Sequence, residues 1–300
     1  MGRHVHARLF GVLGDPVEHS LSPVMHNAAF AALGLPHLYL RYRVAPEDLA
    51  AALAEARRLE MGGLNLTIPL KEAVLPHLDR ATDEARAIGA VNTLVFRGRE
   101  VIGDNTDGRG FLASLAGHGQ VRDAAAVLIG AGGSARAIGA ALVRGGARRV
   151  TIANRTLARA EALADALRGL GARDVGVVPL EWLRRGAVLE DATVIVNTTP
   201  SGLRDVAVPV RFSASPAHAL FVDLVYARRP TPFMAGARRA HRRALDGSGM
   251  LLHQGALAFE TWTARRAPLT VMARALVEAG LPLTRPRRTP TVRDARPEVR

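Results

Sequence analysis

Residues 124–147, AAAVLIGAGGSARAIGAALVRGGA, decide the fold, because they combine an apolar strand, a glycine turn and a helix. The turn, Gly130-Ala131-Gly132-Gly133-Ser134-Ala135, matches the pattern G-x-G-x-x-A. Glycine at the first two fixed positions permits a tight turn and lets backbone N–H groups approach a pyrophosphate, and the small third residue lets helix pack on strand. A second strand, residues 148–155, follows the helix. The stretch therefore predicts a Rossmann unit that binds a dinucleotide.

The residues after the second strand indicate which dinucleotide binds. An NAD site usually carries an acidic residue there for the ribose 2′-hydroxyl, whereas a 2′-phosphate needs positive charge. This chain has Asn154, Arg155 and Thr156, and Arg159 stands one helical turn after Arg155. The two guanidinium groups can flank one phosphate, with Thr156 and the helix start adding donors. The pattern favours NADP, and the missing carboxylate counts against S-adenosylmethionine.

Strand and helix patterns alternate on both sides of this unit. Strands are expected at 8–15, 37–44, 62–68, 92–96, 100–105, 175–180, 192–199 and 218–226. Helices are expected at 23–34, 45–59, 82–90, 156–171, 231–244, 249–266 and 268–280. Such alternation predicts an α/β fold with mainly parallel sheets. The length of the chain, 300 residues, leaves room for two domains.

Composition excludes several classes of protein. With 48% hydrophobic and 22% charged residues, the chain is expected to fold rather than stay disordered. The absence of cysteine excludes disulfides, thiol nucleophiles and cysteine metal sites, and the ten histidines lack an H-E-x-x-H spacing, so no metal is expected. No apolar run reaches the roughly 18 residues of a membrane span, and the first residues lack the apolar core of a signal peptide. A cytoplasmic location is expected.

The net charge of +13 raises the question of nucleic-acid binding. Arginine is scattered along the whole chain, and aromatic residues make up only 4%, too few for stacking platforms on single strands. The segment 285–300 is rich in arginine and proline and is expected to be a basic, disordered tail. We interpret the charge as a solvated surface and expect no nucleic-acid partner.

Of the 40 Lys and Arg residues, only Lys71 is a lysine. Arginine does not release its proton in a protein, whereas a lysine ammonium can when it is desolvated or paired. Lys71 is therefore a candidate for proton transfer, although its survival in an arginine-biased chain can also be chance.

Clusters of small hydroxyl and amide side chains end several of the expected strands. They are Ser20-Leu21-Ser22-Pro23, Asn65-Leu66-Thr67-Ile68-Pro69-Leu70-Lys71, Ala90-Val91-Asn92-Thr93 and Gly103-Asp104-Asn105-Thr106-Asp107-Gly108. Open α/β sheets bind ligands at the carboxyl ends of their strands, and these groups together suit a small polyol. Taken singly, S-x-S-P is typical of a helix N-cap, N-x-T-x-P of a loop and D-x-x-D-G of a turn.

In this order the motifs resemble those of the shikimate dehydrogenase family. The matching patterns are S-x-S-P, N-x-T-x-P-x-K, G-A-V-N-T, D-N-T-D-G, G-A-G-G-S-A-R, N-R-T-x-x-R and D-G-x-G-M. The resemblance runs from Ser20 to the helix of Gln254 and excludes the chain after about Thr284. Leu70, where the family commonly has Phe, is one departure, and the basic tail is another.

The resemblance implies a fold, an activity and a cofactor. Residues 1–106 plus 247–284 would form the substrate domain, and residues 107–246 would form an inserted Rossmann domain for NADP(H), with a cleft between them. The activity would be the reversible reduction of 3-dehydroshikimate to shikimate by NADPH, in the pathway to chorismate and the aromatic amino acids.

The resemblance also implies roles for individual residues. Lys71 and Asp107 would be the catalytic pair. The substrate would be bound by Ser20, Ser22, Asn65, Thr67, Lys71, Asn92, Asp107, Tyr226 and Gln254. The cofactor would be held by Gly130, Ala131, Gly132, Gly133, Ser134, Ala135, Asn154, Arg155, Thr156 and Arg159, with Leu224, Gly247 and Met250 nearer the nicotinamide and Asp83 as a weaker candidate.

Alternatives stay open at this point. Related enzymes act on quinate or aminoshikimate; Ser20 and Ser22 together favour shikimate, and an NAD-preferring quinate enzyme would be expected to carry an acid near Asn154. A catalytically silent NADP-binding regulator is an alternative from another class, but both Lys71 and Asp107 are retained. The sequence leaves monomer and homodimer equally open.

Overall fold

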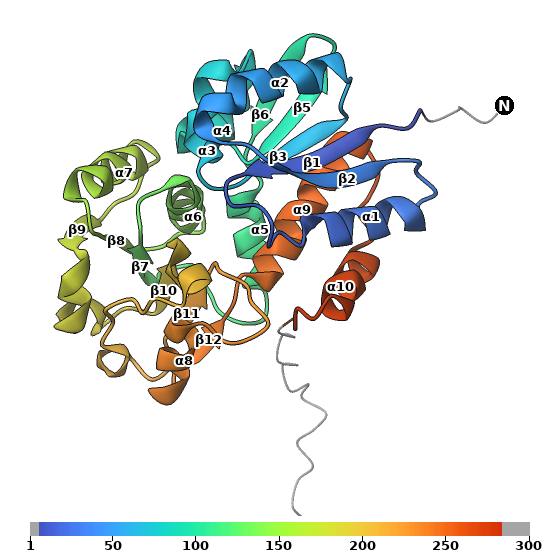
Figure 1. Ribbon diagram of the computed structural model, residues 1–300. Helices are drawn as coiled ribbons and strands as arrows, with labels where there is room; N and C mark the ends of the chain where they lie inside the picture. The colour runs from blue at the N-terminus through green and yellow to red at the C-terminus, as the bar shows by residue number, and fades with distance from the viewer. Residues whose placement is uncertain (1–5, 284–300) are drawn as a thin grey trace, which may run out of the picture.

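The computed structural model describes residues 6–283 and contains two six-stranded sheets, each covered by helices (Figure 1). The predicted α/β fold is confirmed. The basic tail predicted at 285–300 lies outside the described residues. Within 6–283, no helix is long and apolar enough to cross a membrane.

The first sheet is mixed and has the strand order β2-β1-β3-β5-β6-β4. Its strands are β1 (Leu9–Gly14), β2 (Leu38–Arg43), β3 (Gly63–Leu66), β4 (Arg80–Ala81), β5 (Thr93–Arg97) and β6 (Glu100–Asp104). β1 pairs in parallel with β2 and β3, and β4 pairs in parallel with β6, whereas β5 runs antiparallel to both of its neighbours. The carboxyl ends of β1 and β3 consequently meet at one edge of the sheet.

The helices of the first part of the chain cover both faces of this sheet. They are α1 (Ser22–Ala32), α2 (Leu49–Arg58), α3 (Leu70–Ala73) and α4 (Asp83–Ile88), joined from the end of the chain by α9 (Ser248–Thr263) and α10 (Leu269–Glu278). One core packs Phe10 and Phe30 against Phe259 of α9, and another packs α2 against Leu64 and Leu94. The end of the chain therefore completes the first domain's core.

The second sheet is parallel throughout and has the order β12-β11-β10-β7-β8-β9. Its strands are β7 (Ala125–Ile129), β8 (Arg149–Asn154), β9 (Val175–Pro179), β10 (Val194–Asn197), β11 (Leu220–Asp223) and β12 (Arg243–Leu245). Its helices are α6 (Gly133–Arg144), α7 (Leu157–Gly169) and α8 (Pro232–Arg239). Numbered within this sheet alone, the order is 3-2-1-4-5-6, which is the Rossmann order, and the switch point falls between β7 and β10.

Helix α5 (Asp107–Ser114) lies with α9 between the two sheets (Figure 1). Two glycines let it pack closely against both domains. A Cβ on Gly108 would lie 2.9 Å from the Ala137 carbonyl oxygen of α6, and one on Gly110 would lie 2.6 Å from the Gln254 backbone nitrogen of α9. α5 thus joins the Rossmann unit to the helix that completes the first domain.

Two predictions about local structure were wrong. The helix predicted over 231–244 ends at Arg239; His241 has φ +55°, and residues Arg243–Leu245 form the edge strand β12 beside β11. Taken singly, the pattern D-x-x-D-G is typical of a turn, but Asp107-Gly108 begins α5. Glycine is a poor helix former, and here packing between α6 and α9 overrides that local preference.

Candidate active site

A cavity of about 210 Å³ lies between the two sheets. From the first domain it is lined by side chains at the ends of β1 and β3, and from the Rossmann domain by residues that follow β7, β10 and β11. All nine predicted substrate residues line it, and so do Ser134, Leu224, Gly247 and Met250. The topology therefore gathers positions from Ser20 to Gln254 around one space.

Lys71 and Asp107 form a buried ion pair in this cavity. Lys71 Nζ lies 2.5 Å from Asp107 Oδ2, and the two side chains are 12% and 4% exposed. Lys71 Nζ also lies 3.2 Å from Ser134 Oγ of the glycine turn. Asp107 is the first residue of α5, where the helix dipole favours a negative charge. The pair sits where the predicted substrate residues meet the glycine turn.

Asn92 fixes the orientation of Asp107. Its amide nitrogen, which carries two hydrogens, has three acceptors within reach: Asp107 Oδ1 at 2.8 Å, Thr106 Oγ1 at 3.0 Å and Gln254 Oε1 at 3.3 Å. Its amide oxygen accepts from the Thr106 backbone N–H at 2.8 Å. Because that N–H can only donate, it fixes which way the amide points. Asp107 is thereby held between an ammonium and an amide.

Asn65 is held by a residue that the sequence did not single out. The Tyr39 hydroxyl donates to Asn65 Oδ1 at 2.8 Å, and Asn65 Nδ2 donates to the Asn92 carbonyl at 3.0 Å and to Thr93 Oγ1 at 3.1 Å. Burial raises the pKa of Tyr39, so its hydroxyl stays protonated and available as a donor. In the sequence, Tyr39 was only one residue of the strand predicted at 37–44.

Ser20, Ser22 and Tyr226 line another part of the cavity. The Ser22 backbone N–H donates to Ser20 Oγ at 3.3 Å, and the Leu21 N–H donates to the Tyr226 hydroxyl at 3.4 Å. Burial raises the pKa of Tyr226, so it too stays neutral. Hydroxyl groups from two distant segments therefore face the same space.

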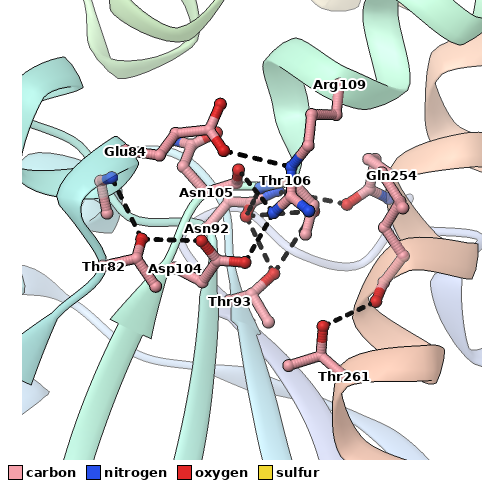
Figure 2. A network of polar contacts seen from close by, with 12 residues as sticks. Thr82, Glu84, Asn92, Thr93, Asp104, Asn105, Thr106, Arg109, Gln254 and Thr261 are labelled. Carbon is pink, nitrogen blue, oxygen red and sulfur yellow. Dashed lines mark hydrogen bonds and ion pairs between the residues drawn. The ribbon is translucent and has the colours of Figure 1, made fainter. Parts of the chain in front are cut away.

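A second polar network fixes the strand end that precedes Asp107 (Figure 2). Thr82 Oγ1 donates to Asp104 Oδ1 at 2.8 Å, and Arg109 Nη2 donates to Asp104 Oδ2 at 2.7 Å. Arg109 Nε also lies 3.2 Å from Glu84 Oε2. These contacts tie α4, β6 and the first turn of α5 together, so Asp107 has a rigid support.

The glycine turn has the shape that a phosphate group needs. Gly130 has φ +108°, and a Cβ there would lie 2.5 Å from Thr198 Oγ1, so a larger residue does not fit. Beside Gly132, by contrast, the nearest atoms to an added Cβ are Arg159 Nη2 and Glu72 Oε1, each at 4.0 Å. The open space lies at the start of α6, whose N–H groups suit an anion. These residues fit a dinucleotide phosphate.

The arginines predicted to bind the 2′-phosphate lie beyond the end of β8. Arg155 and Arg159 are both exposed, and the Asn154 amide donates to the Thr156 carbonyl at 2.8 Å. Arg159 Nη2 lies 3.5 Å from Glu72 Oε1 across the cleft. The other oxygen of Glu72 lies 3.4 Å from Arg136 Nε.

The chain matches three family models. They are the shikimate dehydrogenase substrate binding domain over residues 12–94, shikimate / quinate 5-dehydrogenase over 113–228 and the shikimate 5′-dehydrogenase C-terminal domain over 247–277. The shikimate dehydrogenase (NADP(+)) of Geobacter metallireducens is 44% identical over 276 residues, which cover 91% of this chain and 96% of that protein. The chain belongs to the shikimate dehydrogenase family.

Solved structures agree with this assignment to the family. The crystal structure of shikimate 5-dehydrogenase from Thermus thermophilus, in complex with NADP(H) and shikimate, is 40% identical with a TM-score of 0.79, covering 91% of this chain and 99% of that one. Quinate dehydrogenase from Corynebacterium glutamicum, in complex with NAD, is 30% identical with a TM-score of 0.81 and the same coverage. The resemblance to the shikimate dehydrogenase family, inferred from motifs, is confirmed.

One residue suggested by the shikimate dehydrogenase resemblance does not reach the cleft. Asp83 begins α4, its side chain is 96% exposed, and it forms an ion pair with Arg86. It belongs neither to the cavity lining nor to the glycine turn or the segment 154–159, so its role toward the cofactor stays a prediction without support from the geometry. Conversely, the prediction missed Tyr39 and Glu72, which contact the site residues Asn65 and Arg159. It also missed Arg109, which holds Asp104 and Asn105 just before Asp107.

Proposed function

We propose that this protein is an NADP-dependent shikimate dehydrogenase that interconverts 3-dehydroshikimate and shikimate. The observation that carries the proposal is the buried Lys71–Asp107 pair, enclosed by hydroxyl and amide side chains and touching Ser134 of the nucleotide turn. An ammonium at that place can supply a proton to a substrate oxygen that faces the cofactor.

NADPH, when bound, supplies the hydride for the C3 carbonyl of the substrate. Lys71 Nζ then gives a proton to the oxygen as negative charge develops on it, and takes the proton back in the oxidative direction. Asp107, which Asn92 holds in place, accepts a hydrogen bond from the hydroxyl formed at C3 and so orients the ring of the substrate. Such proton transfer contributes about 10²- to 10⁴-fold in rate.

The remaining assignments are part of the same proposal. Ser20, Ser22 and Gln254 position the substrate carboxylate and ring hydroxyls, with help from Asn65, Thr67 and Tyr226. The dinucleotide is held by the turn from Gly130 to Ala135 and by the segment from Asn154 to Arg159, with Leu224, Gly247 and Met250 beside the nicotinamide. This assignment is supported by the absence of an acidic side chain in that segment and by the open space beside Gly132.

The two sheets support a division into a substrate part, residues 1–106 with 247–284, and an NADP part, residues 107–246. The division leaves Asp107 on the helix that joins them. A cytoplasmic location, the absence of a nucleic-acid partner and assembly as a monomer or homodimer stay predictions.

The direct test follows NADPH and NADH oxidation with 3-dehydroshikimate, and compares shikimate with quinate in the oxidative direction. We expect turnover with NADPH and with the shikimate pair, at least about tenfold above NADH and above quinate. Preference for quinate or NAD would overturn the choice of substrate or cofactor. No turnover with any pair, in a protein that still binds NADP⁺, would favour the non-catalytic NADP-binding regulator.

A further inference from the structure

A second cavity, of about 250 Å³, lies in the first domain, away from the active site. It opens at the start of β1 and at the end of α9, and is lined by His6, Arg8, Phe10, Leu35, His37, Trp262, Thr263 and Arg265. The active site uses the opposite ends of the same elements: Val12 farther along β1, and Gln254, eight residues before Trp262 on α9. Nothing in the proposed reaction uses this second cavity.

The inner wall of the cavity is aromatic and fixed in place. The ring centroids of Phe10 lie 5.2 Å from Trp262 and 5.3 Å from His37, and Phe30 meets His37 edge-on at 5.2 Å. The Trp262 indole N–H donates to the Leu94 carbonyl at 2.9 Å, which anchors the ring to β5. Phe10 and Phe30 are buried and support the wall from behind, so the half-buried Trp262 and His37 rings form the rigid surface that faces a flat ligand.

The rim of the cavity is cationic. Arg8 and Arg265 are exposed, and within residues 6–283 no carboxylate forms an ion pair with either guanidinium. Burial lowers the pKa of His37, and the nearby charges of Arg8 and Arg265 lower it further. The His37 Nδ1 accepts from the Arg8 backbone N–H at 3.3 Å, so the proton of the neutral ring sits on Nε2 as a further donor. The positive charges of Arg8 and Arg265 thus lie at the same cavity, and no carboxylate of residues 6–283 pairs with them.

We propose that this cavity binds a small organic anion, namely a carboxylate carried on a flat apolar ring. Guanidinium groups bind carboxylates through paired, charge-assisted hydrogen bonds, and the half-buried Trp262 and His37 rings provide the surface against which the ring of the ligand packs. Neither half of the site suffices by itself: an inorganic anion leaves the aromatic wall uncovered, and a neutral ring leaves the arginines unpaired. This proposal does not depend on the reaction at the other cavity.

The test uses Trp262 as the reporter. Trp182→Phe removes the other tryptophan, which lies in the Rossmann domain, and leaves an indole in the cavity wall. Fluorescence of this full-length protein is then titrated with benzoate, with benzyl alcohol as the neutral ring and with inorganic phosphate as the anion without a ring. We expect saturable binding of benzoate at least about tenfold tighter than that of either partial ligand.

Matched arginine variants locate the site. Arg265→Gln is expected to weaken benzoate binding about tenfold, and Arg8→Gln to weaken it in the same sense, because each removes a charge-assisted hydrogen bond. Arg266→Gln, a neighbouring exposed arginine outside the cavity lining, is expected to leave binding unchanged. Thermal unfolding of each variant checks that it is folded. Equal weakening by all three variants, equal affinity for benzyl alcohol, or no saturable signal would overturn the proposal.

Discussion

Asn92 binds Asp107 through the oxygen that Lys71 leaves free. Its amide donates to Oδ1 at 2.8 Å, while Lys71 Nζ lies 2.5 Å from Oδ2. Asp107 therefore has a fixed plane, and the ammonium it holds has a fixed place. The position of the proposed proton donor depends on a neutral amide as much as on the ion pair.

Replacing this amide by a carboxylate should impair catalysis without removing volume. Asn92→Asp places a negative oxygen against Asp107 Oδ1 and loses a donor to a charged group, so we expect kcat to fall about 10- to 100-fold. Steady-state kinetics in both directions measure the effect. Thr261→Val, which removes a hydroxyl that bonds only to its own helix, is the control and should leave kcat unchanged. An Asn92→Asp enzyme with the kcat of the parent would contradict the positioning role.

The sequence predicted the strand ends and the residues that meet there, and physical reasons explain this success. Parallel strands bring their carboxyl ends to one edge, so Asn65, at the end of β3, lines the cavity as expected. The expectation was wrong for Asn92, which reaches the cavity from the start of β5 because β5 runs antiparallel to β3 and β6. The G-x-G-x-x-A turn correctly predicted the Rossmann unit. The structure shows why glycine is needed at its first position, since a Cβ at Gly130 would lie 2.5 Å from Thr198 Oγ1.

What the sequence could not predict depends on packing. Asp107 was recognised, but not the helix it begins, since Gly108 and Gly110 argue against a helix until α6 and α9 are in place. Tyr39 carried no functional signal in the sequence, because only the fold brings its hydroxyl to Asn65, 26 positions away. Glu72 carried no pattern at all, since its partners lie on the other domain.

The contact between α5 and α9 should tolerate no added methyl group. A Cβ on Gly110 would lie 2.6 Å from the Gln254 backbone nitrogen and 2.7 Å from its Cβ, so Gly110→Ala must push the two helices apart. We expect a loss of about 1–3 kcal/mol in the free energy of unfolding, measured by chemical denaturation.

Gly169→Ala is the matched control for this helix contact. Gly169 ends α7 and has no atom within 4 Å of an added Cβ, so alanine there should leave stability unchanged or raise it slightly. A Gly110→Ala protein as stable as Gly169→Ala would show that the helices can separate at no cost.

Arg159 should exchange its ion pair with Glu72 for one with the 2′-phosphate of the bound nucleotide. It lies 3.5 Å from Glu72 Oε1, and the two side chains are 58% and 35% exposed, so this ion pair is weak and easily exchanged. We expect Arg159→Gln to weaken binding of 2′,5′-ADP about tenfold while leaving 5′-ADP unchanged. Glu72→Gln should tighten 2′,5′-ADP by no more than about fivefold.

Isothermal titration with both nucleotides measures these effects. Arg168→Gln, on the same helix and paired with Asp165, is the control and should bind both nucleotides as the parent does. If Arg159→Gln weakened both nucleotides equally, Arg159 would not recognise the 2′-phosphate.

Asp223, at the end of β11, should make stability depend on pH. Burial raises its pKa from 3.8 to about 6, although Thr231, the Val225 N–H and Asn197 all donate to it. The folded state therefore binds a proton more tightly than the unfolded state. The free energy of unfolding should fall by about 2–3 kcal/mol as pH rises from about 4 to about 6, and this contribution should be level above that.

Asp223→Asn should remove this slope, because an amide does not titrate and can still accept at one atom and donate to Thr231 at the other. Chemical denaturation between pH 4 and 7 compares the Asp223→Asn protein with a Glu47→Gln control. Glu47 is exposed, so its replacement should keep the dependence of the unfolding free energy on pH. Parallel profiles for the Asp223→Asn and parent proteins would contradict the raised pKa.

The central claim, that Lys71 transfers the proton, is tested most directly by Lys71→Arg. Arginine keeps the positive charge and the pairing with Asp107 but does not release a proton. With NADPH and 3-dehydroshikimate, we expect kcat to fall about 10²- to 10⁴-fold, with NADPH affinity and thermal stability close to those of the parent. A Lys71→Arg enzyme that turns over at nearly the parent rate would show that this residue supplies charge alone, and the proposed mechanism would be wrong.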